Sequence, residues 1–160
     1  MKSYVLDRDD GEAWWMFDSL DTIKADSDQT SDAFGVVEFL EFKGSGPPLH
    51  VHHRCEQGFY VLEGDLSFRL AGQRTRAGKG SWIFVPRGVP RGWYCESPRA
   101  RVLSVIVPGG FEEFYRQVGD RVYERDNLPT PTEPDVQSLS EVAARFGVTI
   151  VGPPIGGLAD

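Results

Sequence analysis

Short apolar runs alternate with glycine- and proline-rich turns through the middle of the chain, from residue 34 to residue 107. Turns at residues 44–48, 63–64 and 86–88 each stop a stretch of strand-favouring residues. The 18 glycines and 11 prolines leave little room for long helices. Short strands that recur with turns between them predict an all-β sandwich or barrel.

Composition restricts the class of protein further. A chain of 160 residues, 40% of them hydrophobic, is long enough for one domain with a substantial core. The net charge of −7 argues against nucleic-acid binding, which needs a basic face. No apolar run reaches membrane-spanning length, and residues 1–12 lack a signal-peptide core. The two cysteines, Cys55 and Cys95, imply no disulfide framework, so we expect a cytoplasmic protein.

Residues 1–33 precede the main strand pattern and form its first segment. They hold two short extended candidates, at residues 3–6 and 13–17, followed by a polar loop at 26–33. The second candidate contains Trp14-Trp15-Met16-Phe17 and is strongly apolar. We expect this segment to pack on the barrel or on a second subunit, which predicts a homodimer.

Residues 108–160 form the last segment, with one or two short helices. One apolar helix face is predicted at i, i+3, i+4 and i+7 by Phe111, Phe114, Tyr115 and Val118. The proline-rich stretch 128–135 is extended. Ser138 and Glu141 have the spacing of a capping box for the second helix. Residues 148–151 are an edge-strand candidate.

All three histidines lie together, at His50, His52 and His53. Side chains alternate along an extended strand, so His50 and His52 point to the same face. The buried-type run 59–62 follows closely. Two imidazoles on one strand face are half of a metal site, and the alternative is a polar strand with surface histidines.

The sequence resembles the cupin superfamily at this point. The first cupin motif is G-x5-H-x-H-x4-E-x6-G, and here the matching positions are Gly44, His50, His52, Gln57 and Gly64. The spacing is kept throughout, and one residue type differs.

The second cupin motif, G-x5-P-x-G-x2-H-x3-N, matches Gly80, Pro86, Gly88, Arg91 and Cys95. Its spacing is also kept. The resemblance implies a jelly-roll barrel, a double-stranded β-helix, over residues 34–107 with the site inside it. The stretch 145–154 is similar to the tail of single-domain cupins described as quercetinase-like.

Gln57, Arg91 and Cys95 replace the glutamate, histidine and asparagine of the motifs. The resemblance implies that one divalent metal (zinc, iron, nickel or manganese) would be held by His50, His52 and Gln57. A protonated arginine offers no lone pair, and a glutamine brings no negative charge. Both changes oppose a bound cation, so we expect weak or absent metal.

The preferred interpretation gives Arg91 the electrostatic role of the metal. A fixed guanidinium would stabilise a carboxylate, phenolate or enolate, while His50 or His52 moves a proton. The alternatives are a surface ion pair for Arg91 and a satisfied core amide for Gln57. Alternation places the neighbouring Glu56 on the other strand face.

An apolar wall would surround these polar groups. The residues predicted to contact substrate are Gln57, Phe59, Val61, Phe68, Arg91, Trp93 and Cys95. Aromatic walls around a few polar groups suit a flat organic ligand, although each apolar residue is equally explained as barrel core. Cys95 is more simply an inert thiol, with nucleophilic catalysis as a minor option.

Three classes of function remain open at this stage. One is a metal-independent isomerase or cyclase with catalytic His50, His52 and Arg91, acting on an enolisable or aromatic, oxygen-rich and possibly anionic substrate. A second is a mononuclear-metal dioxygenase of the quercetinase type. The third is a binding protein without catalysis. All three predict a small-molecule partner.

Overall fold

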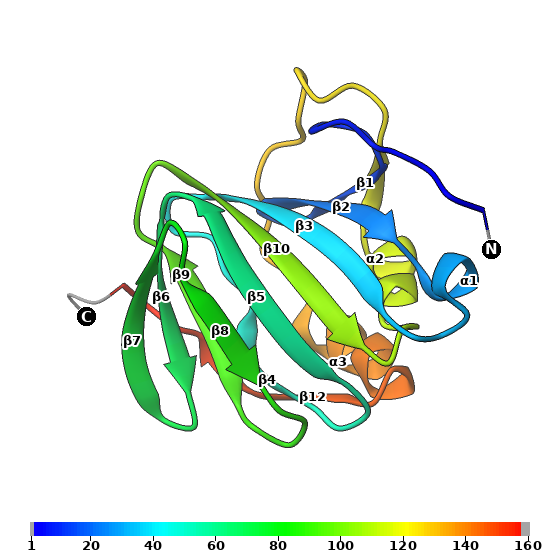
Figure 1. Cartoon of the computed structure of the whole chain (residues 1–160). Coiled ribbons are helices and arrows are strands. Elements are labelled where there is room, and N and C mark those ends of the chain that lie inside the picture. Colours follow the sequence, from blue (N-terminus) through cyan, green and yellow to red (C-terminus); the bar gives the residue numbers. More distant parts are fainter. Residues whose placement is uncertain (1, 158–160) are drawn as a thin grey trace.

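The computed structural model describes residues 2–157, which fold into two antiparallel β-sheets that face each other (Figure 1). The predicted all-β jelly-roll class is confirmed together with the short C-terminal helices, and one further short helix lies near the N-terminus. Among the described residues, no helix is both long and apolar enough to cross a membrane.

The larger sheet includes the N-terminal strands. In spatial order it contains β11 (Asp120–Val122), β1 (Glu12–Met16), β2 (Ser19–Ala25), β3 (Gly35–Phe42), β10 (Arg99–Val107), β5 (Glu56–Glu63) and β8 (Trp82–Val85). Because β11 pairs with the outer side of β1, the first strand is not an open edge. Trp15 and Met16 are accordingly buried within the same chain, at 5% and 8% exposure. Burial of these side chains therefore does not require a second subunit at this strand, which was the reason for expecting a dimer there.

The smaller sheet carries the histidines. Its spatial order is β12 (Val148–Pro154), β4 (Pro48–His52), β9 (Arg91–Cys95), β6 (Asp65–Leu70) and β7 (Gln73–Gly78). The edge strand expected at residues 148–151 is present as β12, and it pairs Val148 with His52 and Ile150 with His50.

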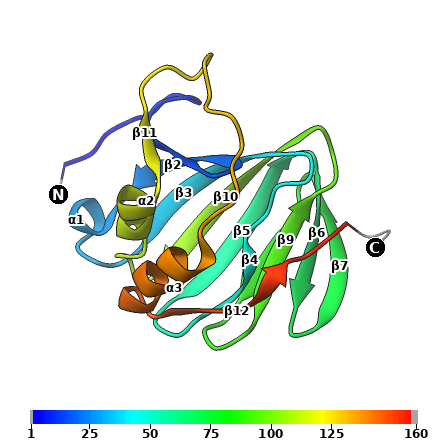
Figure 2. The same cartoon turned by 180° about the vertical axis from the view of Figure 1, so that it is seen from behind.

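Three short helices complete the fold, α1 (Ser27–Thr30), α2 (Glu112–Val118) and α3 (Val136–Arg145). The helix α1 lies where a loop was predicted, because Asp26 and Gln29 form a capping box. The cap expected at Ser138 is wrong: Asp135 caps α3 and accepts from the backbone N–H of Ser138. Figure 2 shows α3 near β12 and α2 beside α3, and the rings of Phe114 in α2 and Phe146 at the end of α3 are 5.8 Å apart.

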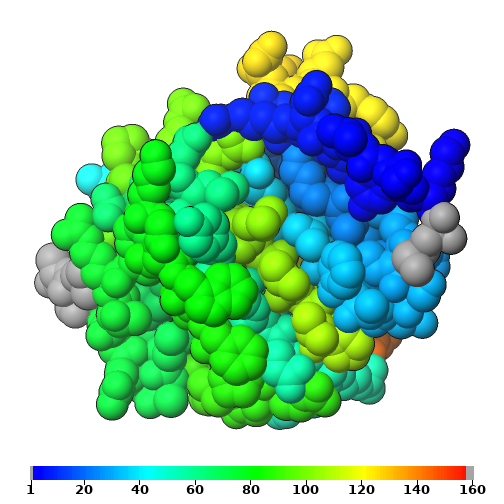
Figure 3. Space-filling view, in the orientation of Figure 1, coloured from blue at the N-terminus to red at the C-terminus, as the bar shows by residue number. Residues whose placement is uncertain are grey.

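The extended candidate at residues 3–6 is not a strand. The N-terminal residues instead run along the upper side of the molecule in Figure 3 as irregular chain (dark blue). The Tyr4 hydroxyl donates to the carbonyl of Lys24 at 2.8 Å, which ties this segment to β2. Side-chain anchoring thus replaces strand pairing at this end.

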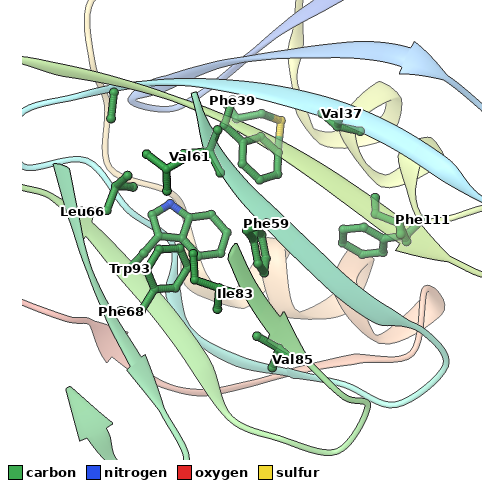
Figure 4. Packing of buried hydrophobic residues seen from close by; sticks show 14 of the residues in the cluster. Val37, Phe39, Phe59, Val61, Leu66, Phe68, Ile83, Val85, Trp93 and Phe111 are labelled. Carbon is green, nitrogen blue, oxygen red and sulfur yellow. The ribbon is translucent and has the colours of Figure 1, made fainter. Parts of the chain in front are cut away.

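An aromatic cluster fills the space between the sheets (Figure 4). Trp93 from β9 stacks on Phe39 from β3, with ring centroids 5.6 Å apart. Phe59 and Phe68 lie 5.3 and 5.9 Å from the same indole ring. Trp93 therefore contacts both sheets and forms the floor on which the candidate site lies.

Candidate functional site

A cavity of about 770 Å³ opens between the two sheets. Its walls come from β2, β3, β4, β5 and β9, and it is bordered by α2, α3, β12 and the linker residues Thr132–Pro134. The linker is tied down by a hydrogen bond of 2.9 Å from the N–H of Thr132 to the carbonyl of Phe17. A cavity of this size fits a small organic molecule.

His50 offers a free lone pair to the cavity. Its Nδ1 lies 2.8 Å from the carbonyl oxygen of Pro48, and a carbonyl only accepts, so Nδ1 carries the proton. The Nε2 atom is then unprotonated and has no hydrogen-bond partner within residues 2–157. Burial lowers the pKa of His50 to about 4, so this imidazole is neutral at neutral pH.

His52 lies beside it, with the two ring centroids 5.1 Å apart. Its Nδ1 is 3.1 Å from Sγ of Cys55, a contact that the sequence analysis did not anticipate. Burial, reinforced by the charges of neighbouring cationic groups, lowers the pKa of His52 well below its usual range. His53 lies outside, exposed, and bonds Thr149. Both cavity histidines are therefore neutral at neutral pH.

Arg91 is fully buried, at 0% exposure, directly across from His50 on the neighbouring strand. Its Nε donates to Oε1 of Gln57 at 2.9 Å and its Nη1 to the carbonyl of Val89 at 3.2 Å. Nη2 has no partner among the described residues, and burial lowers the pKa of Arg91 to about 10. Arg91 makes no ion pair, so the surface salt-bridge alternative is wrong.

Arg91 also does not line the cavity, whereas Gln57 does. Because a guanidinium nitrogen can only donate, it fixes the orientation of the Gln57 amide, with the oxygen turned toward Arg91. The amide nitrogen of Gln57 has no hydrogen-bond partner in the described chain. The group that presents a donor to the cavity is therefore Gln57, with Arg91 behind it.

The predicted apolar wall divides into two sets. Gln57 and Trp93 line the cavity, while Phe59, Val61, Phe68 and Cys95 lie in the core beneath it, at 1% exposure or less. The Cys95 thiol donates to the carbonyl of Ser97 at 3.3 Å, and burial raises its pKa to about 11. This thiol is protonated and directed at the backbone, which argues against a nucleophilic role.

Glu56 lies outside the barrel, as strand alternation predicts. Its carboxylate pairs with Arg87, with Nε and Oε1 2.6 Å apart. It is thus unavailable as a replacement for the missing family glutamate.

Three carboxyl groups that the sequence analysis missed form the other end of the cavity. They are Asp18, Asp21 and Glu41. Burial raises the pKa of Asp18 to about 6 and that of Glu41 to about 7, and it raises the pKa of Asp21 well above its usual range. Polar residues on these strands resemble a solvent-facing pattern in sequence, so only the tertiary structure shows that they face inward.

The donor set does not fit a tightly bound divalent metal. Within the part of the chain that the structure describes, no group of three or more His, Cys, Asp or Glu side chains is arranged to hold one. The Gln57 oxygen, the third expected ligand, already accepts from Arg91. Two neutral imidazoles with a buried guanidinium nearby are a weak cation site.

β-Barrels with strand histidines directed into an internal cavity form a class of proteins that bind small molecules, and this fold has those features. A cupin-domain family model matches residues 38–106, which span both motifs. Residues 38–106 are thus a cupin domain by sequence as well as by fold.

Two curated relatives are quercetin 2,3-dioxygenases. The Bacillus subtilis protein is 29% identical over 130 residues, covering 81% of this chain and 39% of the relative. The Aspergillus japonicus protein is 30% identical over 118 residues, covering 69% of this chain and 30% of the relative. The chain thus spans about a third of the length of these relatives.

The fold is also similar to solved structures. KdgF from Halomonas sp. matches with a TM-score of 0.63 at 18% identity, over 71% of this chain and 99% of that one. At this identity the likeness concerns the fold alone.

Proposed function

We propose that this protein binds a small aromatic or enolisable, oxygen-rich molecule in the cavity and acts on it by acid/base chemistry of the isomerase or cyclase type. The observation that carries the proposal is the unprotonated Nε2 of His50, which has no hydrogen-bond partner among residues 2–157 and belongs to a side chain that lines a mainly apolar cavity. A free lone pair in such a place is suited to accept a proton.

The proposed step transfers one proton. Nε2 of His50 takes a proton from carbon next to a carbonyl, the C–H electron pair moves into the new enolate, and the carbonyl oxygen becomes negative. The Gln57 amide N–H donates to that oxygen, strengthened by the hydrogen bond from Arg91. The adjacent enolate offsets the cost of charging a buried imidazole. Return of the proton to another carbon completes an isomerisation. His50 and Gln57 contact the substrate in this scheme, and Arg91 positions Gln57.

The carboxyl groups narrow the ligand class. The cavity lining contains Asp18, Asp21, Glu41 and the exposed Glu133, and no lysine or arginine among the residues described. No cationic side chain among these described lining residues would pair with an anionic substrate, and an added negative charge would oppose ionisation of the carboxyl groups. We therefore favour a neutral or cationic ligand over the anionic one that the sequence suggested.

Deuterium exchange tests the proposal without knowledge of the natural substrate. Phenylacetone in D₂O serves as an enolisable aromatic probe, and proton NMR follows the loss of its α-protons. We expect exchange well above the buffer rate with the unmodified protein, and a loss of about a hundredfold in His50→Gln. His53→Gln is the matched control, since His53 lies outside the cavity. Exchange no faster than in buffer, or equal loss in both variants, would refute the proposed chemistry.

The quercetin 2,3-dioxygenase relatives favour a second candidate, an oxygen-dependent cleavage of a flavonol. It would require a metal held by His50, His52 and Gln57, a set that Arg91 opposes here. An oxygen electrode with quercetin as the probe and protein preincubated with Fe²⁺, Ni²⁺ or Mn²⁺ decides between them. Oxygen uptake that depends on His52 would favour the dioxygenase. Binding of quercetin without turnover in either assay would leave a binding protein.

We also propose a cytoplasmic homodimer. With β1 covered by β11, the edges of the larger sheet are the three-residue strand β11 and the strand β8. Trp82 and Phe84 on β8 are each 57% exposed, and the adjacent Tyr60 is 43% exposed. Pairing of two β8 edges around a two-fold axis would cover these aromatic side chains.

A further inference from the structure

The cavity has two chemically different ends. The histidine end is described above, and the opposite end contains Asp18, Asp21 and Glu41. Trp93 lies between them, because its Nε1 donates to Oε1 of Glu41 at 2.8 Å while its ring edge faces His50 at 6.1 Å. A ligand in this space would therefore meet an acceptor-rich carboxyl end as well as the histidines.

The strand register places two of these carboxyl groups on one face. In the β2–β3 pair, Ser19 lies opposite Glu41 and Asp21 lies opposite Phe39. Asp21 is two residues beyond Ser19, so its side chain points the same way as that of Glu41. Asp21 and Glu41 are 5% and 2% exposed.

Their acceptor capacity is only partly used within the protein. Glu41 accepts from the Ser45 hydroxyl and from Trp93. Asp21 accepts from the Ser19 hydroxyl at 3.0 Å, through Oδ1 alone. Its Oδ2 accepts no hydrogen bond from residues 2–157. The charges of Glu41 and Asp18 add to the effect of burial in raising the pKa of Asp21, so no buried cation compensates this end.

Tyr115 supplies an independent indication of a ligand. This side chain from α2 lines the same cavity and is only 6% exposed. Its hydroxyl has no hydrogen-bond partner in the described chain. Burial, reinforced by the charge of Asp21, raises the pKa of Tyr115 well above its usual range. A phenol buried to this degree normally has a partner. An unpartnered hydroxyl and an unused carboxyl oxygen that line the same cavity are the arrangement expected when a third group binds to both.

We propose that Asp21, Glu41 and Tyr115 form a subsite for a hydrogen-bond-donating group of the ligand, an ammonium in preference to a hydroxyl. An ammonium would bring the positive charge that this end lacks and could donate to the free Oδ2 of Asp21 and to the Tyr115 oxygen together. This subsite rests on the proposal that the cavity binds a small aromatic molecule. It assigns the end of the ligand that lies away from the histidines.

Three matched probes test the subsite by calorimetry at pH 8. Tyramine carries an ammonium, 4-(2-hydroxyethyl)phenol a hydroxyl, and 4-ethylphenol neither. We expect tyramine to bind the unmodified protein at least about tenfold more tightly than 4-ethylphenol, the effect of a charge-assisted hydrogen bond. Equal binding of tyramine and the hydroxyl probe, both tighter than 4-ethylphenol, would assign a neutral donor to the same subsite.

Variants connect the preference to the carboxyl end. Asp21→Asn should remove the advantage of tyramine, and Glu41→Gln should reduce it. Asp126→Asn, which makes the same charge change at an exposed position, should leave it intact. Equal affinity for all three probes, or an unchanged preference in Asp21→Asn, overturns the subsite. If His50→Gln still weakens all three, the proposed cavity function survives that result. If no probe binds the unmodified protein at 10 mM, both proposals fail.

Discussion

Arg91 and Gln57 are joined across the two sheets by a 2.9 Å hydrogen bond from Nε to Oε1. The arginine replaces a histidine of the family motif, and the glutamine replaces a glutamate. Each substitution alone would leave a buried group without its usual partner. Together the two side chains form a hydrogen bond with each other. Two positions that hold metal ligands in the family motif thus carry a hydrogen-bonded pair, in which Arg91 donates to Gln57 and the Gln57 amide N–H group is presented to the cavity.

Arg91→Met should separate the energetic and chemical roles of this pair. Burial lowers the pKa of Arg91 to about 10, so its charge is held at a cost in the folded state. Its removal nevertheless leaves the buried Gln57 oxygen without a donor, so we expect the free energy of unfolding to fall by about 1–3 kcal/mol in urea titrations at pH 7, while α-proton exchange falls at least about tenfold.

The control for that experiment is Arg87→Met, because Arg87 is half exposed and pairs with Glu56. It should change stability by less than about 1 kcal/mol and leave exchange unchanged. A loss of stability in Arg91→Met with normal exchange would show that the arginine is purely structural.

Arg91→His should raise the affinity for divalent metal. It removes the fixed positive charge and adds a third imidazole to His50 and His52. It also releases the Gln57 oxygen. We expect Zn²⁺ or Ni²⁺ affinity, measured by competition with a chromogenic chelator, to rise at least about a hundredfold over the unmodified protein. Loss of that gain in the double variant with His52→Ala would place the metal in the cavity, whereas an unchanged affinity would contradict the electrostatic argument.

Asp21→Asn should stabilise the protein in a pH-dependent way. A raised pKa means that folded Asp21 retains a proton that the unfolded chain releases above about pH 4. The contribution of this proton to the free energy of unfolding is therefore fully present below that pH. It declines as the pH rises toward the raised pKa of the folded state, by at most about 1.4 kcal/mol per pH unit. The amide side chain introduced by Asp21→Asn does not ionise, so the variant does not lose this stability as the pH rises.

The free energy of unfolding of Asp21→Asn, measured in urea titrations, should thus exceed that of the unmodified protein by almost nothing at pH 4 and by an increasing amount up to pH 8. Asp126→Asn controls for the change in net charge, because Asp126 is exposed. A gain of equal size at every pH would mean that Asp21 has an ordinary pKa. Greater stability with weaker tyramine binding is the combination expected when a carboxylate serves a ligand.

Light scattering at micromolar concentration should give a dimer mass. Trp82→Glu should shift it toward the monomer, because the indole is exposed and packs over Gly58 at the sheet edge. Val151→Glu, a similarly exposed apolar position on β12, should leave the mass unchanged. A monomer mass for the unmodified protein would remove the dimer proposal.

Turn chemistry accounts for the part of the fold that sequence could predict. Glycine and proline clusters delimited the strands from β3 to β10, and alternation placed His50 and His52 together on one face of β4. The strand β2 was missed because its Ser19, Asp21 and Thr22 are polar yet buried, which removes the alternation that identifies a strand.

The candidate site was predictable only in part for a related reason. Lone-pair chemistry indicated that Arg91 could not be a metal ligand. Its bond to Gln57 depends on the approach of β9 to β5 across the barrel, which no local pattern encodes. The carboxyl end depends likewise on β2 joining the larger sheet.

The pairing of β12 with β4 affects how the site is made in the cell. Val148 takes its place beside His52 only after the whole barrel and α3 have been synthesised. On the ribosome, the histidine strand therefore waits with one edge unpaired until the last strand emerges. A nascent chain interrupted before Val148 would contain both cupin motifs and would still lack β12, which borders the cavity.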